Sequence, residues 1–233
     1  MNLTLQTISS TIISEIMADS FLDGVVLDKE HGVFDDERLF SCIQTIKALE
    51  KKCFVRVACF DKQLIRMCLD SGVDGIIFST VEDLQESKEI VEYCRYPKYG
   101  GRRGQGLVRE NKWGNAELGT HNPILMAQIE TKCGVENLDN IMSAGFDYFI
   151  VGPYDLSASL GCVAEWDSER YRKYYQQIES KICNSKLGLF LPSMRQINNF
   201  LDAEERPKIL IWGMDTTFLI EGVDFLRRGI HNE

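Results

Sequence analysis

Two apolar segments of the sequence carry carboxylates that could hold a metal ion. Gln128 and Glu130 lie in the segment 124–131, and Asp155 lies in the segment 149–157. Each segment has the length and character of a buried strand, and alternate strand residues share a face, so Gln128 and Glu130 should point the same way. A buried carboxylate is costly unless it is paired or binds a metal. Two oxygen ligands at the ends of neighbouring strands indicate a hard divalent cation.

Charged residues also lie at or near the ends of two earlier apolar segments. These residues are Asp28 and Arg56. If the segments are parallel strands, all of these charged side chains fall on one rim. A structural alternative remains open, in which Glu130 and Asp155 form salt bridges with Arg56, because ion-pair networks also occur at such rims.

The elements that would position these residues alternate between strands and helices. Strands are expected at residues 3–8, 24–28, 53–58, 75–79, 187–191 and 209–213, and within 124–131 and 149–157. The helices expected between them include a single crossover helix over 135–142, one over 194–201 and a closing helix over 216–228. This count and spacing predict an α/β fold with one (β/α)8 TIM barrel over residues 1–233, in preference to a doubly wound open sheet. In such a barrel, active sites lie at the C-terminal ends of the strands.

Composition narrows the class of protein. The 233 residues are 44% hydrophobic and 26% charged, which suits a single domain. A formal net charge of -9 argues against nucleic acid or an anionic membrane as partner. No Lys or Arg precedes Lys29 and no apolar run could cross a bilayer, so neither a secretory signal nor a membrane span is expected. The scattered cysteines, without a C-x-x-C pair, favour reduced core thiols and a cytoplasmic protein.

The alternation of elements breaks in residues 96–122, which are glycine-rich, basic and without periodicity. We expect a long excursion at a strand–helix junction, and loops of this length are usually functional or disordered. Arg102 and Arg103 are expected in a solvated or anion-binding part of it. A dinucleotide-binding loop over residues 100–106 is not expected, because no strand leads into the run and no helix follows it.

Several short motifs occur in a fixed order along the chain. They are L-D-K-E-H at 27–31, V-R-V at 55–57, Tyr96-Pro97 with Gly100 and Arg102, Q-I-E-T at 128–131 and G-P-Y-D-L-S at 152–157. In combination they resemble the HpcH/HpaI family, the metal-dependent class II pyruvate aldolases typified by 4-hydroxy-2-oxoheptanedioate aldolase and 2-keto-3-deoxy-sugar-acid aldolases.

The resemblance implies a barrel of the phosphoenolpyruvate/pyruvate type and a lyase that cleaves or forms 4-hydroxy-2-oxo acids through a pyruvate enolate. It implies a divalent metal ion (Mg²⁺, Mn²⁺ or Co²⁺) as cofactor and pyruvate plus an aldehyde as small-molecule substrates. It also implies a homo-oligomer, a trimer or a hexamer, in which the C-terminal helix at about 216–228 packs on a neighbouring subunit.

Carried over by position, the resemblance implies a role for each charged residue on the rim. Glu130 and Asp155 would be the metal ligands. Arg56 would face the developing enolate oxygen, where a fixed cation stabilises charge. His31, oriented by Asp28, would take the proton of the hydroxyl at the bond to be cleaved.

The resemblance also implies how pyruvate is bound. The backbone from Gly152 through Tyr154 to Asp155 would bind the pyruvate carboxylate, and Gln128 would support the site from below. The sequence departs from the family at the fourth strand end, where residues 78–80 lack the expected proline.

Other hypotheses lead to different experiments. A Schiff-base aldolase would use a rim lysine, and Lys132 is the candidate near a motif. Borohydride trapping with pyruvate would separate it from a metal-dependent enzyme. A citrate-lyase-type enzyme and a non-catalytic barrel used for binding or assembly are the remaining alternatives. The complete set of charged rim residues favours a working enzyme over the non-catalytic barrel.

Overall fold

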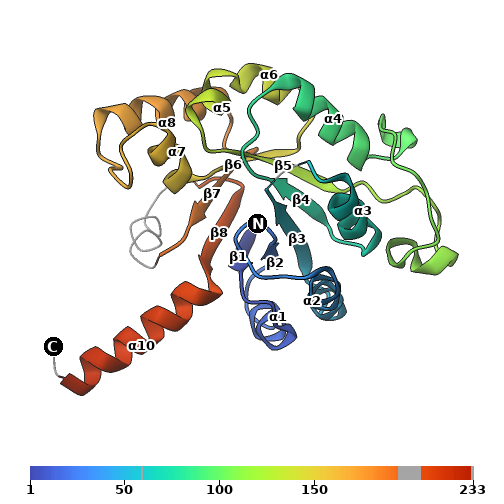
Figure 1. Cartoon of the computed structure of the whole chain (residues 1–233), viewed down its shortest axis with the longest axis horizontal. Helices are drawn as coiled ribbons and strands as arrows, with labels where there is room; N and C mark the ends of the chain where they lie inside the picture. Colours follow the sequence, from blue (N-terminus) through green and yellow to red (C-terminus); the bar gives the residue numbers. More distant parts are fainter. Residues whose placement is uncertain (59, 194–205, 232–233) are drawn as a thin grey trace.

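Eight parallel strands close into a barrel in the computed structural model, which describes residues 1–58, 60–193 and 206–231 (Figure 1). The strands are β1 (Asn2–Gln6), β2 (Gly24–Asp28), β3 (Lys52–Val57), β4 (Gly75–Phe78), β5 (Ile124–Ile129), β6 (Tyr148–Val151), β7 (Leu187–Leu191) and β8 (Ile209–Met214). Each strand pairs with the next, and β1 also pairs with β8. The predicted (β/α)8 barrel is therefore confirmed, and an open sheet, which would leave two strand edges unpaired, is excluded.

Helices surround the strands (Figure 1). They are α1 (Thr11–Ala18), α2 (Asp36–Ala48), α3 (Lys62–Asp70), α4 (Leu84–Cys94), α5 (Lys132–Glu136), α6 (Leu138–Ser143), α7 (Pro153–Ser159), α8 (Glu169–Lys181) and α10 (Asp215–His231), with the 3-10 helices η1 (Pro97–Tyr99) and η2 (Arg109–Gly114). Several helices begin after a residue whose side chain accepts a hydrogen bond from a first-turn amide, namely Asp35, Asp61, Asp83 and Ser168. The expected helix over 194–201 lies outside the described residues.

The crossover between β5 and β6 is two short helices, α5 and α6, and the prediction of one helix is wrong. The break falls at Asn137, which has φ -94° and ψ 9°. Its side-chain amide donates to the carbonyl of Glu82 at 2.9 Å. Asparagine is a poor residue for a helix interior because its side chain offers such competing hydrogen bonds.

The barrel interior changes from apolar to polar along the strands. The apolar layer consists of Leu3, Leu5, Val26, Phe54, Ile77, Met126, Ile150, Ile209 and Ile211. Two residues further along three of these strands stand Asp28, Arg56 and Gln128, all buried. Because strand side chains alternate, these polar groups continue the same inward-facing rows. The barrel therefore has an apolar core, and polar or charged side chains lie at the C-terminal ends of its strands.

The glycine-rich segment 96–122 lies between α4 and β5. The expectation of a strand–helix junction is therefore wrong, because this is a helix–strand connection. Such connections lie at the opposite end of a barrel from the rim where active sites form. Arg109 Nη1 donates to the carbonyl of Ser71 at 2.7 Å and holds the segment beside the end of α3.

Helix α10 extends away from the barrel (Figure 1). Its first residue, Asp215, is buried and accepts hydrogen bonds from the backbone amides of Thr7 and Ile8, which ties the end of β8 to the end of β1. Beyond that point the helix exposes large apolar side chains, namely Leu219, Ile220, Val223, Phe225, Leu226 and Ile230. An apolar face of this extent is typical of a surface that contacts another protein chain.

The cysteines of the described residues are free thiols. Five of them are buried, as expected for core thiols, whereas Cys133 and Cys183 are exposed, and Cys59 lies outside the described residues. No helix in the described part of the chain is long and apolar enough to cross a bilayer.

Candidate active site

Asp28 and Arg56 form a buried ion pair across β2 and β3, where the two residues are directly in register. Arg56 Nε and Nη2 donate to the two carboxylate oxygens of Asp28 at 2.9 and 2.8 Å. Its third nitrogen, Nη1, lies 3.1 Å from Glu30 Oε2. Burial by itself would lower the pKa of Arg56, but the hydrogen bond and charge of Asp28, with the charges of Glu30 and Glu130, raise it. The result is a guanidinium held charged and in one orientation.

The turn after β2 is organised by Asp28. Its Oδ1 atom accepts the backbone amides of Glu30 at 3.1 Å and His31 at 3.4 Å. A Cβ atom on Gly32 would overlap with the Asp28 carbonyl, so only glycine fits there. Asp28 therefore orients His31 through the backbone of this turn, and its carboxylate makes no contact with the imidazole among the described hydrogen bonds.

The imidazole of His31 is exposed on the rim. Its side chain is 66% exposed, and Nε2 lies 4.0 Å from Glu30 Oε2. The ring is free to meet a substrate that enters from solvent. Sequence reasoning did not select Glu30 as a site residue. Glu30 follows Asp28 by two residues in the L-D-K-E-H motif. Its place between two proposed site residues, Asp28 and His31, could have identified it as a candidate.

Glu130 follows β5 directly and is buried. Oε1 accepts the backbone amide of Thr80 at 2.7 Å and its hydroxyl at 2.9 Å, and Oε2 accepts the side-chain amide of Gln128. Burial raises the pKa of Glu130; the hydrogen bonds from Gln128 and Thr80 oppose this, and the charges of Glu30 and Asp155 add to it. A positive ion beside Glu130 would relieve this unfavourable burial of charge.

Thr80 holds Glu130 from a strained backbone conformation. Its φ is 53°, in the left-handed region that β-branched residues rarely adopt. Strain of this kind persists where the surrounding structure requires it, often at functional sites. Residues 78–80 stood out in the sequence only for the missing proline, and no spacing signal marked Thr80 as a partner of Glu130.

Gly152 provides room for Glu130. A Cβ atom at this position would overlap with Glu130 Oε2 and would lie 2.9 Å from Gln128 Nε2. The end of β6 therefore packs against the carboxylate through bare backbone, and any other residue here would displace the carboxylate. Gln128 donates a hydrogen bond to Glu130 from within β5, in keeping with the supporting role that the family resemblance implied.

The expectation of a buried strand over 149–157 is wrong beyond Val151, where β6 ends, because Pro153 begins α7. Asp155 and Tyr154 lie in the first turn of α7, and both are exposed. Asp155 is close enough for its charge to raise the pKa of Glu130. The ring of Tyr154 packs edge-on against Trp166, with centroids 5.0 Å apart. Both side chains therefore stand at the mouth of the barrel, above the buried Glu130.

Two carboxylates at this end of the barrel, Glu130 and Asp155, are the candidate ligands for a hard divalent cation. Among the described residues, Arg56 forms its ion pairs with Asp28 and Glu30, and neither Glu130 nor Asp155 has one. The structural alternative, a salt-bridge network of Glu130 and Asp155 with Arg56, is therefore not observed in these residues. Glu30 Oε2 is buried and receives no hydrogen bond of good geometry from them, despite its ion-pair distance to Arg56.

A metal at this site would rely on few protein ligands. Within the described part of the chain, no group of three or more His, Cys, Asp or Glu residues is placed to hold a metal ion. Glu130 and Asp155 would supply two carboxylates, and substrate oxygens and water would have to complete the shell. Mg²⁺ and Mn²⁺ accept such mixed oxygen coordination.

Comparison with known proteins gives a consistent result. A family model described as HpcH/HpaI aldolase/citrate lyase matches residues 6–221. A 2-keto-3-deoxy-L-rhamnonate aldolase from Klebsiella pneumoniae subsp. pneumoniae is 30% identical over 223 residues, 93% of this chain and 80% of that protein. A hydroxypyruvate/pyruvate aldolase from Roseobacter denitrificans is 31% identical over 166 residues, 68% of this chain and 64% of that protein.

The crystal structure of an HpcH/HpaI aldolase/citrate lyase family protein from Burkholderia cenocepacia J2315 has the same fold. It superposes with a TM-score of 0.85 at 21% sequence identity, over 99% of this chain and 94% of that one.

Proposed function

This chain belongs to the HpcH/HpaI aldolase/citrate lyase family and is a lyase, and we propose that it is a metal-dependent aldolase that cleaves or forms 4-hydroxy-2-oxo acids. Pyruvate would be one reaction partner and an aldehyde the other. Relatives named for 2-keto-3-deoxy-L-rhamnonate and for hydroxypyruvate/pyruvate support this class of substrate.

The observation that carries the proposal is the buried carboxylate of Glu130 beside Asp155, without an ion pair among the described residues. Glu130 and Asp155 would hold a divalent ion, Mg²⁺, Mn²⁺ or Co²⁺. When bound, such an ion supplies a Lewis acid for the keto oxygen of the substrate. The hydrogen bonds from Thr80 and Gln128 keep the Glu130 carboxylate in one orientation for this purpose.

Arg56 supplies the fixed positive charge of the site. Cleavage of the bond between C3 and C4 releases the aldehyde and leaves its electrons on the pyruvate part as an enolate, whose C2 oxygen carries developing negative charge. A guanidinium already locked by Asp28 stabilises that charge without reorganising. The substrate carboxylate would meet the amides of Tyr154 and Asp155, which belong to the first turn of α7 and have no acceptor within the helix.

His31 would accept the proton of the 4-hydroxyl group during cleavage. An exposed imidazole on the rim can reach a substrate group that points away from the barrel floor. Imidazole accepts and returns protons near neutral pH, as a reversible aldol reaction requires.

The Schiff-base alternative has little support. Lys132 is the first residue of α5, its side chain is 51% exposed, and its Nζ lies 3.7 Å from the carboxylate of Glu136 on the same helix. This ion pair joins two exposed side chains on the surface of α5.

Removal of divalent metal tests the proposed function. Dialysis against a chelator should abolish cleavage of a 4-hydroxy-2-oxo acid, because two carboxylate ligands hold an ion loosely enough to exchange. Addition of Mg²⁺, Mn²⁺ or Co²⁺ should restore cleavage, measured as pyruvate released. Full activity in excess chelator, together with borohydride trapping of pyruvate, would instead support a Schiff-base enzyme.

We also propose that the chain forms a homo-oligomer, a trimer or a hexamer, through α10. A cavity of 640 Å³ lies between α1, the barrel and α10, and its apolar lining includes Ile16, Phe21 and Phe218. Val223→Asp should lower the molar mass measured by light scattering, because it places a charge on the exposed apolar face of α10. Asp224→Asn, next to it, is the control. A wild-type monomer at micromolar concentration would contradict the proposal.

A further inference from the structure

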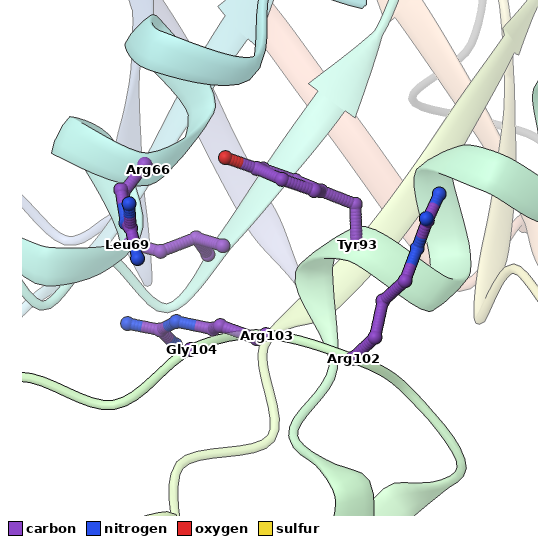
Figure 2. A pocket seen from close by; sticks show the side chains of 6 residues that line it. All are labelled: Arg66, Leu69, Tyr93, Arg102, Arg103 and Gly104. Carbon is purple, nitrogen blue, oxygen red and sulfur yellow. The ribbon is translucent and has the colours of Figure 1, made fainter.

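A cavity of 270 Å³ lies at the barrel periphery, between α3, α4 and the connection that follows α4 (Figure 2). Its lining residues are Arg66, Leu69, Tyr93, Arg102, Arg103 and Gly104. Three of these six residues are arginines, on a chain whose formal net charge is -9. Arginines concentrated in one cavity of an acidic protein indicate a site for an anion.

The cavity is separate from the candidate active site. Arg102, Arg103 and Gly104 belong to the helix–strand connection between α4 and β5, which reaches the barrel at the N-terminal end of β5. Glu130 follows the C-terminal end of the same strand. The length of β5 therefore lies between the two sites.

Arg103 is the fixed part of the cavity. It is 5% exposed, its Nη2 donates to Asp70 Oδ1 at 3.0 Å, and its guanidinium lies 4.4 Å from the ring centroid of Tyr96. The Nε atom is buried and has no hydrogen-bond partner among the described residues. An N–H group that is both buried and unpartnered is costly, and an acceptor from a ligand would satisfy it.

A neutral histidine lies next to Arg103. His121 Nδ1 is 3.4 Å from Arg103 Nη1. Burial, followed by the charge of Arg103, lowers the pKa of His121 to about 4. At neutral pH the imidazole is therefore uncharged and can accept from the guanidinium, so the positive charge of the cavity comes from its arginines.

Arg66 and Arg102 are the exposed arginines of the cavity. Arg66, on α3, has no ion pair within the described part of the chain. Arg102 is 55% exposed, and its Nε lies 3.7 Å from Glu92 Oε2. With Asp70 against Arg103 and Glu92 against Arg102, three guanidinium groups face two carboxylates. One positive charge on the cavity wall is left without a balancing carboxylate among the described residues.

Gly104 lets these groups come together. A Cβ atom at this position would lie 2.9 Å from Arg66 Nη2, so the guanidinium of Arg66 passes directly over bare backbone. Figure 2 shows the side chain of Arg103 extending below Leu69 toward the side of the cavity where Arg66 lies. Two guanidinium groups that line one small cavity repel each other unless an anion lies between them.

We propose that this cavity binds the phosphate group of a small phosphorylated compound. A guanidinium group can donate two parallel hydrogen bonds to two oxygens of a phosphate. Because phosphate is tetrahedral, two guanidinium groups can bind it in this way from different directions. A carboxylate has only two oxygens, which lie in one plane, and it would bind one guanidinium group in this way. The cavity of 270 Å³ is larger than a phosphate group alone, so it has room for a small organic part as well.

Calorimetric titration with inorganic phosphate tests this assignment. The full-length protein is titrated in excess chelator, so that no metal ion at the candidate active site can bind the added phosphate. Wild-type protein should bind phosphate saturably. Arg66→Gln should weaken binding by about tenfold, as expected for one charge-assisted hydrogen bond. Gly104→Ala should weaken it too, because the added methyl group displaces the tip of Arg66.

Arg38→Gln is the matched control, because Arg38 is exposed on α2 and is not among the cavity's lining residues. It removes the same charge and should leave the phosphate affinity within about twofold of wild type. The proposal is overturned if wild-type protein shows no saturable binding, or if Arg66→Gln and Arg38→Gln weaken binding equally. Malonate that binds as tightly as phosphate would overturn the assignment to a phosphate group.

Discussion

Glu130→Gln should abolish aldol cleavage and leave the barrel folded. The substitution keeps the volume of the side chain but removes the charge that would attract a divalent ion. Loss of a Lewis acid worth several kcal/mol corresponds to a fall in kcat on the order of 10³-fold or more. Cleavage is measured as pyruvate release, and folding by thermal unfolding followed with circular dichroism.

The effect on stability should be small, because two changes oppose each other. One of the donors from Thr80 and Gln128 would meet the new amide instead of an oxygen, which costs about 1–3 kcal/mol. Burial of a charged carboxylate, which raises the pKa of Glu130, is removed at the same time. Glu136→Gln on the exposed side of α5 is the control and should retain activity. A Glu130→Gln enzyme with wild-type kcat would show that Glu130 is structural.

His31→Ala should separate two reactions that share the same enolate. Cleavage of a 4-hydroxy-2-oxo acid needs a base for the hydroxyl proton, and general acid–base catalysis is worth roughly 10²- to 10⁴-fold. Oxaloacetate decarboxylation also forms the pyruvate enolate but has no hydroxyl to deprotonate. His31→Ala should therefore lose that factor in aldol cleavage and far less in decarboxylation, with both rates measured on the same protein preparation.

Glu130→Gln is the comparison for this experiment, because it should abolish both reactions. Parallel losses of cleavage and decarboxylation in His31→Ala would show that His31 is not the hydroxyl base. A fall in thermal stability with little change in either rate would identify His31 as a structural residue of the turn after β2.

The barrel could be predicted from the sequence because its strands follow a simple rule. Apolar segments alternate with amphipathic ones, and the inward-facing rows that begin at Val26, Phe54 and Met126 end in polar side chains. The break at Asn137 was missed because the apolar spacing continues across it. It depends instead on a tertiary hydrogen bond to Glu82, which no local pattern records.

The site could be predicted in part. The positions of Asp28, Arg56 and Glu130 at the ends of apolar segments predicted that they lie at one end of the barrel. The structure has them there. The partner of Asp28 could not be predicted, because the choice between a nearby imidazole and a guanidinium depends on the register of β2 with β3. Thr80 was missed for a similar reason, since its contact with Glu130 spans two strands and requires a rare backbone conformation.

Exchange of the methyl hydrogens of pyruvate with deuterium from solvent tests the central proposal most directly. Enolate formation is the step shared by every reaction proposed for this site, and exchange reports it without any aldehyde. The full-length protein is incubated with pyruvate in deuterated water, with Mg²⁺ or with excess chelator, and deuterium is measured by mass spectrometry. We expect exchange with Mg²⁺ that falls to the background rate in chelator and in Glu130→Gln. Exchange that is equally fast in excess chelator would contradict a metal-dependent enolate at Glu130 and Asp155.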